Sequence, residues 1–183
     1  MSFFNIVAAT NEDTVVATYE PSKVRSDSYQ SEAELEKEFI RLLCEQGYTY
    51  LPLHTEDELI ANLRSQLEEL NHYQFSDTEW RQFFSDVIAN PNEHIPEKTR
   101  KIQDWEESKQ VLHRDDGSSK NITLIDKKNI HNNRLQVINQ YEVKQADGAR
   151  HDNRYDVTIL VNGFPLVHVE LKRRGVAIRE AFN

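Results

Sequence analysis

An acidic residue and a Glu-x-Lys pair flank the two strands of a predicted β-hairpin in the last third of the chain. Asp156 stands at the entry of the first strand, and Glu170 and Lys172 stand at the exit of the second. Residues two apart in a strand point to the same face, so Glu170 and Lys172 share a surface. Carboxylate oxygens suit Mg²⁺, which polarises a phosphate and lowers the pKa of a bound water. Because a lysine beside them orients that water or neutralises developing charge, the pattern predicts metal-assisted phosphodiester hydrolysis.

The same residues also have a simpler interpretation. In a chain that is 29% charged, an acid followed later by Glu-x-Lys often arises by chance. Alternating charge is also usual on the solvated face of a sheet. The run Leu166–Val169 argues against this interpretation, because it is mostly apolar and predicts an interior strand, where charges are rarely placed without partners.

The turn between the two strands restricts the hydrolytic interpretation. The dipeptide Asn162-Gly163 is a strong hairpin signal, but a two-residue turn there would place Asp156 opposite Val169. Asp156 and Glu170 would then point to opposite faces of the sheet. We therefore expect a connection of odd length, most simply a type I turn with a bulge glycine at positive φ, or else a bulge beside Asp156.

Helices are expected in the first half of the chain. A capping box pairs an N-cap hydroxyl with an acid three residues later and satisfies the free N–H groups of a helix start. Three such boxes occur, at Ser31 with Glu34, at Thr55 with Glu58 and at Ser76 with Glu79. Pro96 in a first helical turn predicts a fourth helix that runs to about Ser108.

Short β-rich runs predominate from about residue 111 onward. The expected strands are Ile122–Ile125, Leu135–Val143, Asp156–Val161 and Phe164–Lys172, with a further short strand earlier at Val15–Tyr19 and a helical start at Val176–Asn183. This order of helices and strands predicts an α/β or α+β fold, in which helices flank a mixed β-sheet core.

Composition excludes several classes of protein. The chain has 183 residues and a formal net charge of −9, so it is not a generic basic nucleic-acid coat, although a local basic patch remains compatible with the charge. It has one cysteine, so no disulfide forms within the chain. No apolar run approaches the ~20 residues of a membrane span, and the first ten residues do not form a signal peptide. We therefore expect a cytoplasmic protein.

At its candidate site the chain resembles the PD-(D/E)xK nuclease superfamily, and in particular the N-terminal endonuclease region of the R subunit (HsdR) of type I restriction enzymes, the type IC group especially. The resemblance spans roughly residues 28–183. It rests on Asp156–Gly163, Pro165–Val167 and Glu170–Lys172, and it continues in Arg173–Asn183. It also covers Ser31-Glu32, Leu35-Glu36, Glu79-Trp80, Lys98–Ile102 and Leu124–Asn129.

The resemblance implies a restriction-endonuclease-like fold and a role for each residue of the hairpin. Asp156 and Glu170 would be the metal-binding acids, Lys172 the catalytic lysine, and the backbone carbonyl of Leu171 a further ligand of Mg²⁺. Residue 155 is Tyr where the superfamily motif nominally has Pro. The family also has a Gln-x-x-x-Tyr motif on a following helix, which we expect beyond Asn183.

The resemblance also implies partners and a domain organisation. Such an R subunit cuts double-stranded DNA together with methyltransferase (M) and specificity (S) subunits, and its motor domain uses ATP. We expect residues 1–30 to be an N-terminal extension and residues 31–183 a nuclease-like domain that is truncated before the following helix and the motor. The alternative is a catalytically inactive, nuclease-like docking module that contacts the motor or methyltransferase subunits.

Other residues are candidates for supporting roles. Glu32 and Glu36 fall inside the apolar arc of the first helix. Nucleases of this superfamily often bring an acid from the first helix to the metal site, so the resemblance implies that Glu32 or Glu36 supports a metal or water. The alternative is that Glu32 stabilises the helix N-terminus and Glu36 extends to the surface. A basic set could hold DNA phosphates: Lys127, Lys128, Arg173 and Arg174. Cys44 lies near the same apolar arc, and we expect it in the core.

Overall fold

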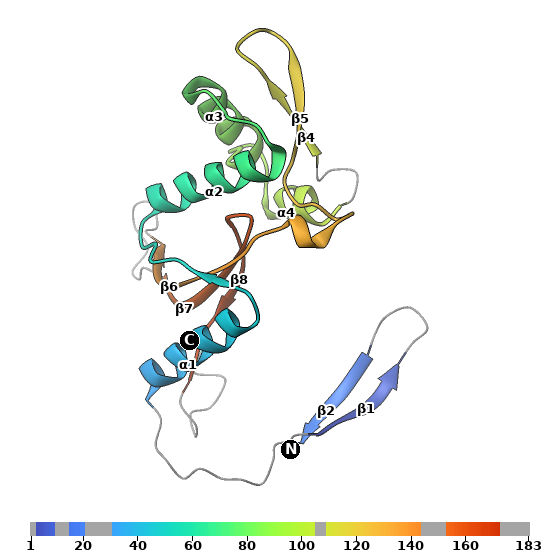
Figure 1. Ribbon diagram of the computed structural model, residues 1–183, viewed down its shortest axis with the longest axis vertical. Coiled ribbons are helices and arrows are strands. Elements are labelled where there is room, and N and C mark those ends of the chain that lie inside the picture. The colour runs from blue at the N-terminus through green and yellow to red at the C-terminus, as the bar shows by residue number, and fades with distance from the viewer. Residues whose placement is uncertain (1–2, 10–14, 21–30, 105–108, 144–152, 173–183) are drawn as a thin grey trace. The chain divides into compact units, whose positions relative to one another are not determined.

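A computed structural model describes residues 3–9, 15–20, 31–104, 109–143 and 153–172 (Figure 1). The chain divides into two compact units, Met1–Gln30 and Ser31–Asn183. In the first unit, β1 (Phe3–Ala9) pairs antiparallel with β2 (Val15–Glu20), and the register shifts between Ile6 and Ala8. The strand expected near Val15 is thus present, whereas β1 was not predicted.

A four-stranded mixed sheet forms the centre of the second unit. Its strand order is β3-β6-β7-β8, with β3 parallel to β6 and the other neighbours antiparallel. The strands are β3 (Thr49–Tyr50), β6 (Leu135–Val143), β7 (Asn153–Val161) and β8 (Phe164–Val169). Together with its helices, this mixed sheet confirms the expected α/β class.

The described part of this unit contains four α-helices: α1 (Glu32–Glu45), α2 (Glu56–Asn71), α3 (Asp77–Phe83) and α4 (Ile95–Gln103). The three predicted capping boxes are all present, so the starts of α1, α2 and α3 are confirmed. A π-helical turn, Phe84–Ile88, extends α3, and a 3₁₀ turn, Ile130–Asn132, precedes β6. In the described segments, no helix has both the length and the apolar character needed to span a membrane.

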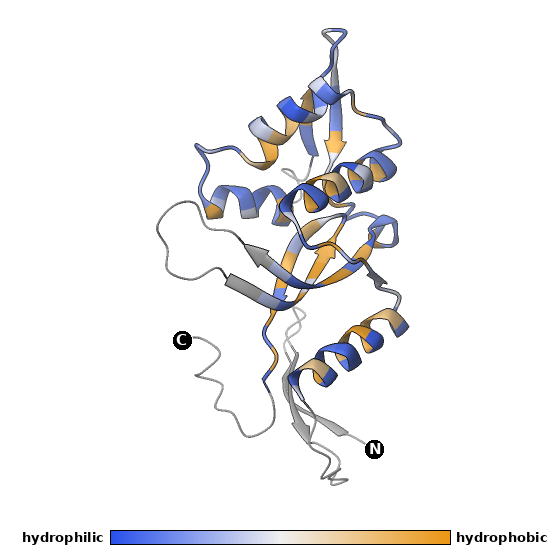
Figure 2. Cartoon of the chain, turned by 90° about the vertical axis from the view of Figure 1, so that its left-hand side faces the viewer, coloured by the Kyte–Doolittle hydropathy of each residue, from blue (hydrophilic) through white to orange (hydrophobic). Residues whose placement is uncertain are grey.

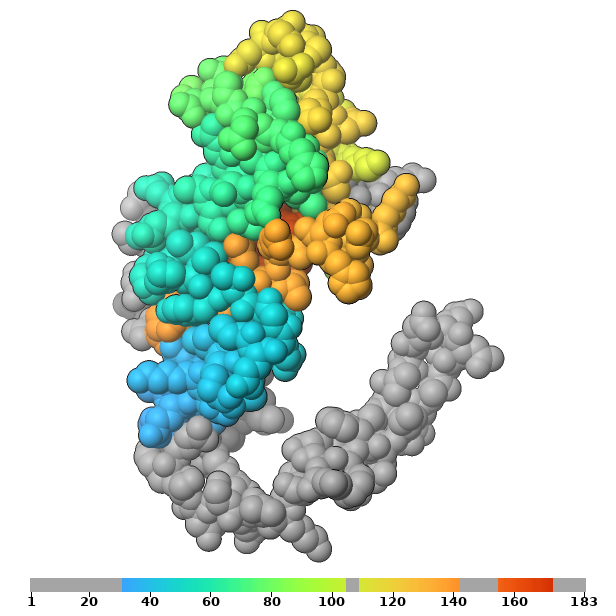
Figure 3. Space-filling model, in the orientation of Figure 1, coloured from blue at the N-terminus to red at the C-terminus, as the bar shows by residue number. Residues whose placement is uncertain are grey.

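The larger core lies between α2, α3 and an antiparallel hairpin made of β4 (Lys109–His113) and β5 (Ser119–Thr123). Its buried side chains include Leu67, Phe83, Leu112 and Ile122. Figure 2 shows the apolar residues concentrated on strands and on the inner faces of the helices, and Figure 3 shows these elements, green to yellow, as one continuous body. Trp80 also belongs to this core.

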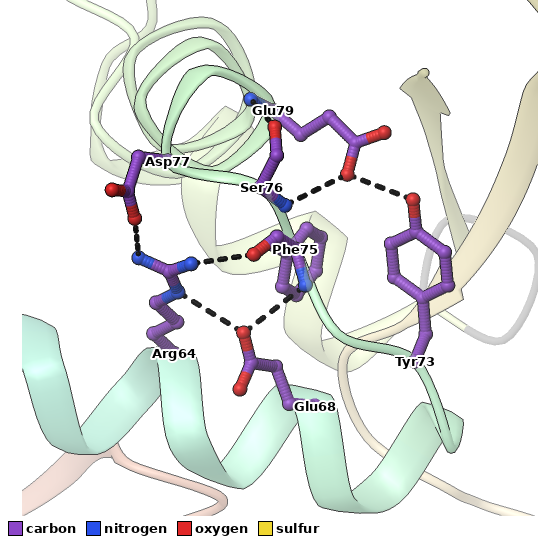
Figure 4. Close-up of polar contacts among 7 residues, drawn as sticks. All are labelled: Arg64, Glu68, Tyr73, Phe75, Ser76, Asp77 and Glu79. Atoms are coloured by element: carbon purple, nitrogen blue, oxygen red, sulfur yellow. Dashed lines mark hydrogen bonds and ion pairs between the residues drawn. The ribbon is translucent and has the colours of Figure 1, made fainter. Parts of the chain in front are cut away.

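The α2–α3 corner is held by three carboxylates and one arginine (Figure 4). Arg64 donates to Glu68 at 3.0 Å, to Asp77 at 2.8 Å and to the backbone oxygen of Phe75 at 2.5 Å. Glu79 closes the other side of the corner, where its carboxylate accepts from backbone and side-chain donors. These charges thus serve the packing of α2 against α3.

A second, smaller core joins α1 to the sheet. Leu43 of α1 packs with Val137 of β6 and Val157 of β7, and Val169 and Leu171 lie against the same cluster. Helix α1 therefore covers the sheet near the carboxyl end of the hairpin. Cys44, which we expected in the core, is exposed, because the buried face of α1 is centred on Leu43.

Candidate active site

The hairpin that carries the candidate residues has a two-residue turn. Val161 pairs with Phe164, and Asn162 and Gly163 adopt φ values of 50° and 83°, the type I′ conformation. Gly163 has the expected positive φ, but the expected connection of odd length is wrong. The buried Asn162 holds the turn, since it accepts from the N–H of Arg134 at 2.8 Å through its side chain.

A β-bulge further along β8 restores the alignment that the turn alone would have lost. Ile159 pairs with Val167 and Leu160 with Pro165, so Leu166 is the extra residue on β8. The ladder therefore continues to Val157 opposite Val169, where β8 ends. The same register, continued by one residue, would place Asp156 opposite Glu170. The bulge lies near the turn and not beside Asp156, where one of our alternatives had placed it.

Strand β8 is an outer strand of the described sheet, so the predicted interior strand is wrong. The apolar side chains of Leu166 and Val167 are 44% and 46% exposed. Pro165 was the signal in the sequence, because proline lacks the N–H that an interior strand must donate and is confined to edges and bulges. The charges at the end of β8 are therefore not buried by two neighbouring strands.

Polar contacts bring the predicted site residues together. The N–H of Leu171 donates to Oδ2 of Asp156 at 2.7 Å, and Nζ of Lys172 lies 2.5 Å from Oε1 of Glu170. The Lys172 and Glu170 side chains are 29% and 34% exposed, so the pair is partly shielded from water. The backbone that would offer the Leu171 carbonyl is thus tied directly to the Asp156 carboxylate.

The charge of Lys172 is held by the carboxylates around it. The hydrogen bond to Glu170 raises the pKa of Lys172 above its usual value; burial opposes this, and the charges of Glu170, Glu32 and Asp156 reinforce it. Lys172 is therefore fully protonated at neutral pH. The same effect shows that Glu32, at the start of α1, lies within electrostatic range of the site.

The two candidate acids of α1, Glu32 and Glu36, have different surroundings. Oε1 of Glu36 accepts from Nδ2 of Asn139 at 2.6 Å, and Oε2 accepts from Nε2 of Gln140. Glu36 thus binds β6 through both of its oxygens, whereas Glu32 acts on Lys172 through its charge. Sequence reasoning missed Asn139 and Gln140, and no local pattern marks either residue as a partner of a helix.

The protein offers part of a ligand set for a divalent metal here. Within the described segments, no three His, Cys, Asp or Glu side chains come together closely enough to hold a metal ion. Two carboxylates and a backbone carbonyl nevertheless suit Mg²⁺, which usually keeps several waters and takes only one or two carboxylates from the protein. The chemistry of Asp156, Glu170 and Leu171 therefore fits this ion.

The candidate phosphate-binding lysines lie at the other end of the hairpin. Asn162 donates to the backbone oxygen of Leu124 at 3.0 Å, which ties the loop that contains Lys127 and Lys128 to the turn. Five residues of β7 separate that turn from Asp156, roughly 17 Å at the usual rise of a strand. The ammonium nitrogen of Lys127 is buried and has no hydrogen-bond partner among the described residues. Arg173 and Arg174 lie outside the described residues.

A separate pocket of about 530 Å³ also lies near the turn. It is lined mainly by apolar side chains of the π-helical turn, α4 and β8. Lys98 and Lys101 of α4 also line it. Among the residues that the structure describes, no carboxylate lines this pocket. Its chemistry therefore differs from that of the hairpin end that carries Asp156.

Comparison with known proteins finds relatives that match most of this chain. A family model described as the N terminus of the type I restriction enzyme R protein matches residues 29–183. The chain is 48% identical over 178 residues to the EcoprrI type I restriction enzyme endonuclease subunit of Escherichia coli, which covers 97% of this chain and 55% of that protein. It is 38% identical to endonuclease subunits of Staphylococcus saprophyticus and Staphylococcus aureus, over 85% of this chain and 16% of each relative. The chain thus spans about half of the first relative and a smaller part of the others.

Proposed function

Because the chain belongs to the family of type I restriction enzyme R protein N-terminal domains, we propose that residues 31–183 form a Mg²⁺-dependent DNA endonuclease domain of the PD-(D/E)xK type. The observation that carries the proposal is the register of β7 with β8, because the bulge at Leu166 shifts it so that its continuation beyond Val157 and Val169 would bring Asp156 opposite Glu170. The contacts of Asp156 with Leu171 and of Glu170 with Lys172 support it.

Each residue has a role that follows from its chemistry. Asp156, Glu170 and the carbonyl of Leu171 would hold Mg²⁺, which when bound polarises the scissile phosphate and lowers the pKa of an attacking water. Lys172 supplies a fixed positive charge beside the phosphate, because its raised pKa keeps it protonated at neutral pH. Glu32 and Glu36 support the site from α1, and Lys128 with Arg173 and Arg174 are candidate contacts to DNA phosphates.

The longer protein of this family would supply the remaining parts of the reaction. We propose that it acts in the cytoplasm on double-stranded DNA, with methyltransferase and specificity subunits and an ATP-driven motor. A net charge of −9 disfavours tight DNA binding by this chain alone, so DNA would have to be delivered to the site. The relatives are named as endonuclease subunits of type I restriction enzymes, which supports the DNA-cutting role.

The test is cleavage by the full R subunit assembled with its partner subunits. Asp156→Ala, Glu170→Ala and Lys172→Ala should each lower cleavage by on the order of several hundredfold or more, because each removes stabilisation of the transition state. ATP hydrolysis should be unchanged, since these side chains act only on the scissile phosphate. Asp57→Asn, at an exposed acid in the first turn of α2, is the control and should cut normally.

Two results would contradict the proposal. Robust cleavage by the Glu170→Ala enzyme would remove Glu170 from the mechanism. Equal loss of cleavage and ATP hydrolysis would favour the docking module, in which these residues contact other domains.

Metal binding can be tested on this chain by itself. A ligand that binds only the folded state raises the apparent melting temperature. Titration with Mg²⁺ or Mn²⁺ should raise the melting temperature of the wild-type chain and of Asp57→Asn, and should leave that of Asp156→Ala unchanged. An equal shift in all three proteins would place the metal elsewhere.

A further inference from the structure

The pairing of β6 with β7 is interrupted at one position. The ladder runs through Asn139 opposite Val157 and resumes at Tyr141 opposite Tyr155, so the skipped pair is Gln140 and Asp156. Gln140 has a φ of 55°, in the left-handed region that non-glycine residues rarely adopt. Such a conformation costs about 1–3 kcal/mol and persists only where surrounding contacts hold it.

Glu36 provides contacts that hold this conformation. In a regular strand the consecutive side chains of Asn139 and Gln140 would point to opposite faces. In this structure both amides donate to the same carboxylate, that of Glu36 on α1. Asn139 is fixed from its other side, where its Oδ1 accepts from the hydroxyl of Tyr50 at 2.8 Å. Helix α1 and strand β3 thus both hold Asn139, the residue directly before Gln140.

We propose that Glu36 is a positioning residue of the nuclease site, which acts through Gln140 to place Asp156. Glu36 holds Gln140 in its left-handed conformation, the conformation opens the ladder at Asp156, and the freed segment lets the Asp156 carboxylate accept the N–H of Leu171. This inference rests on the proposed function, because it assigns Glu36 a role toward the same metal-binding acids. Because the contacts of Glu36 in this structure go to the amides of Asn139 and Gln140, the role we assign to it is to orient the ligands.

The test compares Glu36→Ala with the double variant Glu36→Ala/Gln140→Gly. Glycine adopts positive φ without steric cost, so it keeps the left-handed turn when the Glu36 contacts are gone. If Glu36 acts by enforcing that turn, Gln140→Gly restores the metal affinity that Glu36→Ala loses. If Glu36 binds the metal directly or only stabilises the fold, Gln140→Gly does not restore that affinity. Glu36→Gln, which keeps the side-chain volume, serves as a second variant in case Glu36→Ala unfolds.

Two readouts are needed, one with metal and one without. Mn²⁺ affinity of the 183-residue chain, measured by calorimetry, should fall about tenfold or more in Glu36→Ala, as is usual for partners that orient metal ligands. It should return to within about threefold of the wild type in the double variant. Without metal, amide exchange at Leu171 reports the hydrogen bond to Asp156. That exchange should accelerate in Glu36→Ala and slow again in the double variant.

The matched control is Glu38→Ala, on the same helix, whose carboxylate contacts Arg41 at the exposed surface. It should change neither Mn²⁺ affinity nor Leu171 exchange. Unchanged values in Glu36→Ala, or a loss that Gln140→Gly does not rescue, would overturn the inference. If the wild-type chain binds no Mn²⁺, the proposed metal site fails, and Leu171 exchange still decides whether Glu36 positions Asp156.

Discussion

Glu79 is a buried carboxylate that serves the fold and not the proposed chemistry. It accepts hydrogen bonds from the hydroxyl of Tyr73 at 2.8 Å, from the N–H of Ser76 at 3.0 Å and from the N–H of Asp115 at 3.1 Å (Figure 4). Burial disfavours the charged form of Glu79, but these hydrogen bonds outweigh it and hold the pKa below the usual 4.5. The side chain therefore joins the start of α3 to the β4–β5 hairpin as a charged group.

We expect Glu79→Gln to lower the free energy of unfolding by about 2 kcal/mol at pH 7, since hydrogen bonds to a charged acceptor are lost or inverted. A carboxylate with a lowered pKa contributes stability above the pKa of the unfolded chain and loses it as pH falls. The difference between wild type and variant should therefore be constant above about pH 5 and shrink as pH falls through the folded-state pKa. Urea unfolding at a series of pH values measures it.

Glu58 offers the control for this prediction, because it occupies the same capping-box position in α2 but is exposed. Glu58→Gln should cost markedly less than Glu79→Gln at pH 7. Equal losses would show that the capping position, and not the buried network, accounts for the effect.

At the scale of the elements, the hairpin turn is fitted against helix α2. A Cβ built on Gly163 would lie 2.7 Å from the Cα of Leu63, closer than real Cβ contacts come. Gly163 also has a φ of 83°, which disfavours any other residue. The turn and α2 therefore approach to a distance that only glycine allows, and this contact anchors the hairpin that carries the site.

Gly163→Ala should destabilise the protein by more than 2 kcal/mol, roughly, because strain at positive φ adds to a clash with helix backbone. Gly117 in the β4–β5 turn is the matched control: its φ is 80°, but nothing lies within 4 Å of the added Cβ. Gly117→Ala should cost only about 1 kcal/mol. Chemical unfolding of both variants gives the comparison, and equal costs would mean that the approach to α2 contributes nothing.

At the scale of the whole molecule, the division into Met1–Gln30 and Ser31–Asn183 has a counterpart in the comparisons. The family model begins at residue 29, close to the boundary between the units. The second unit has its own cores, which is the usual condition for a domain to fold by itself. We propose that the nuclease-like domain folds without residues 1–28.

Deletion of residues 1–28 should change the free energy of unfolding of the remainder by no more than about 0.5 kcal/mol, the usual range for changes away from a core. Deletion of residues 1–45, which also removes α1 and Leu43, should be strongly destabilising because it opens the smaller core. Urea unfolding of the three chains distinguishes these outcomes. A large loss from the shorter deletion would show that the first unit supports the second.

Local chemistry explains how much of the fold was predictable. Each capping box is completed within four residues, so Ser31, Thr55 and Ser76 marked three helix starts correctly. The expected strand Leu135–Val143 has the same bounds as β6, and Asn162-Gly163 marked the turn of the hairpin. Residue type and spacing also singled out Asp156, Glu170 and Lys172, whereas their roles came from the resemblance and stay a prediction.

The sequence by itself thus determined where elements begin and which residue types could do the chemistry. Only the tertiary structure decided that Leu166 is the bulge residue and that β8 lies at the edge of the described sheet. It also decided that the loop with Lys127 lies at the turn end of the hairpin. It also decided that Glu36 binds Asn139 and Gln140, more than 100 residues away. These features depend on which distant side chains share one space. One extra residue in a strand turns every later side chain to the other face of the sheet. The position of that extra residue is set by packing across the sheet and not by neighbours in the chain.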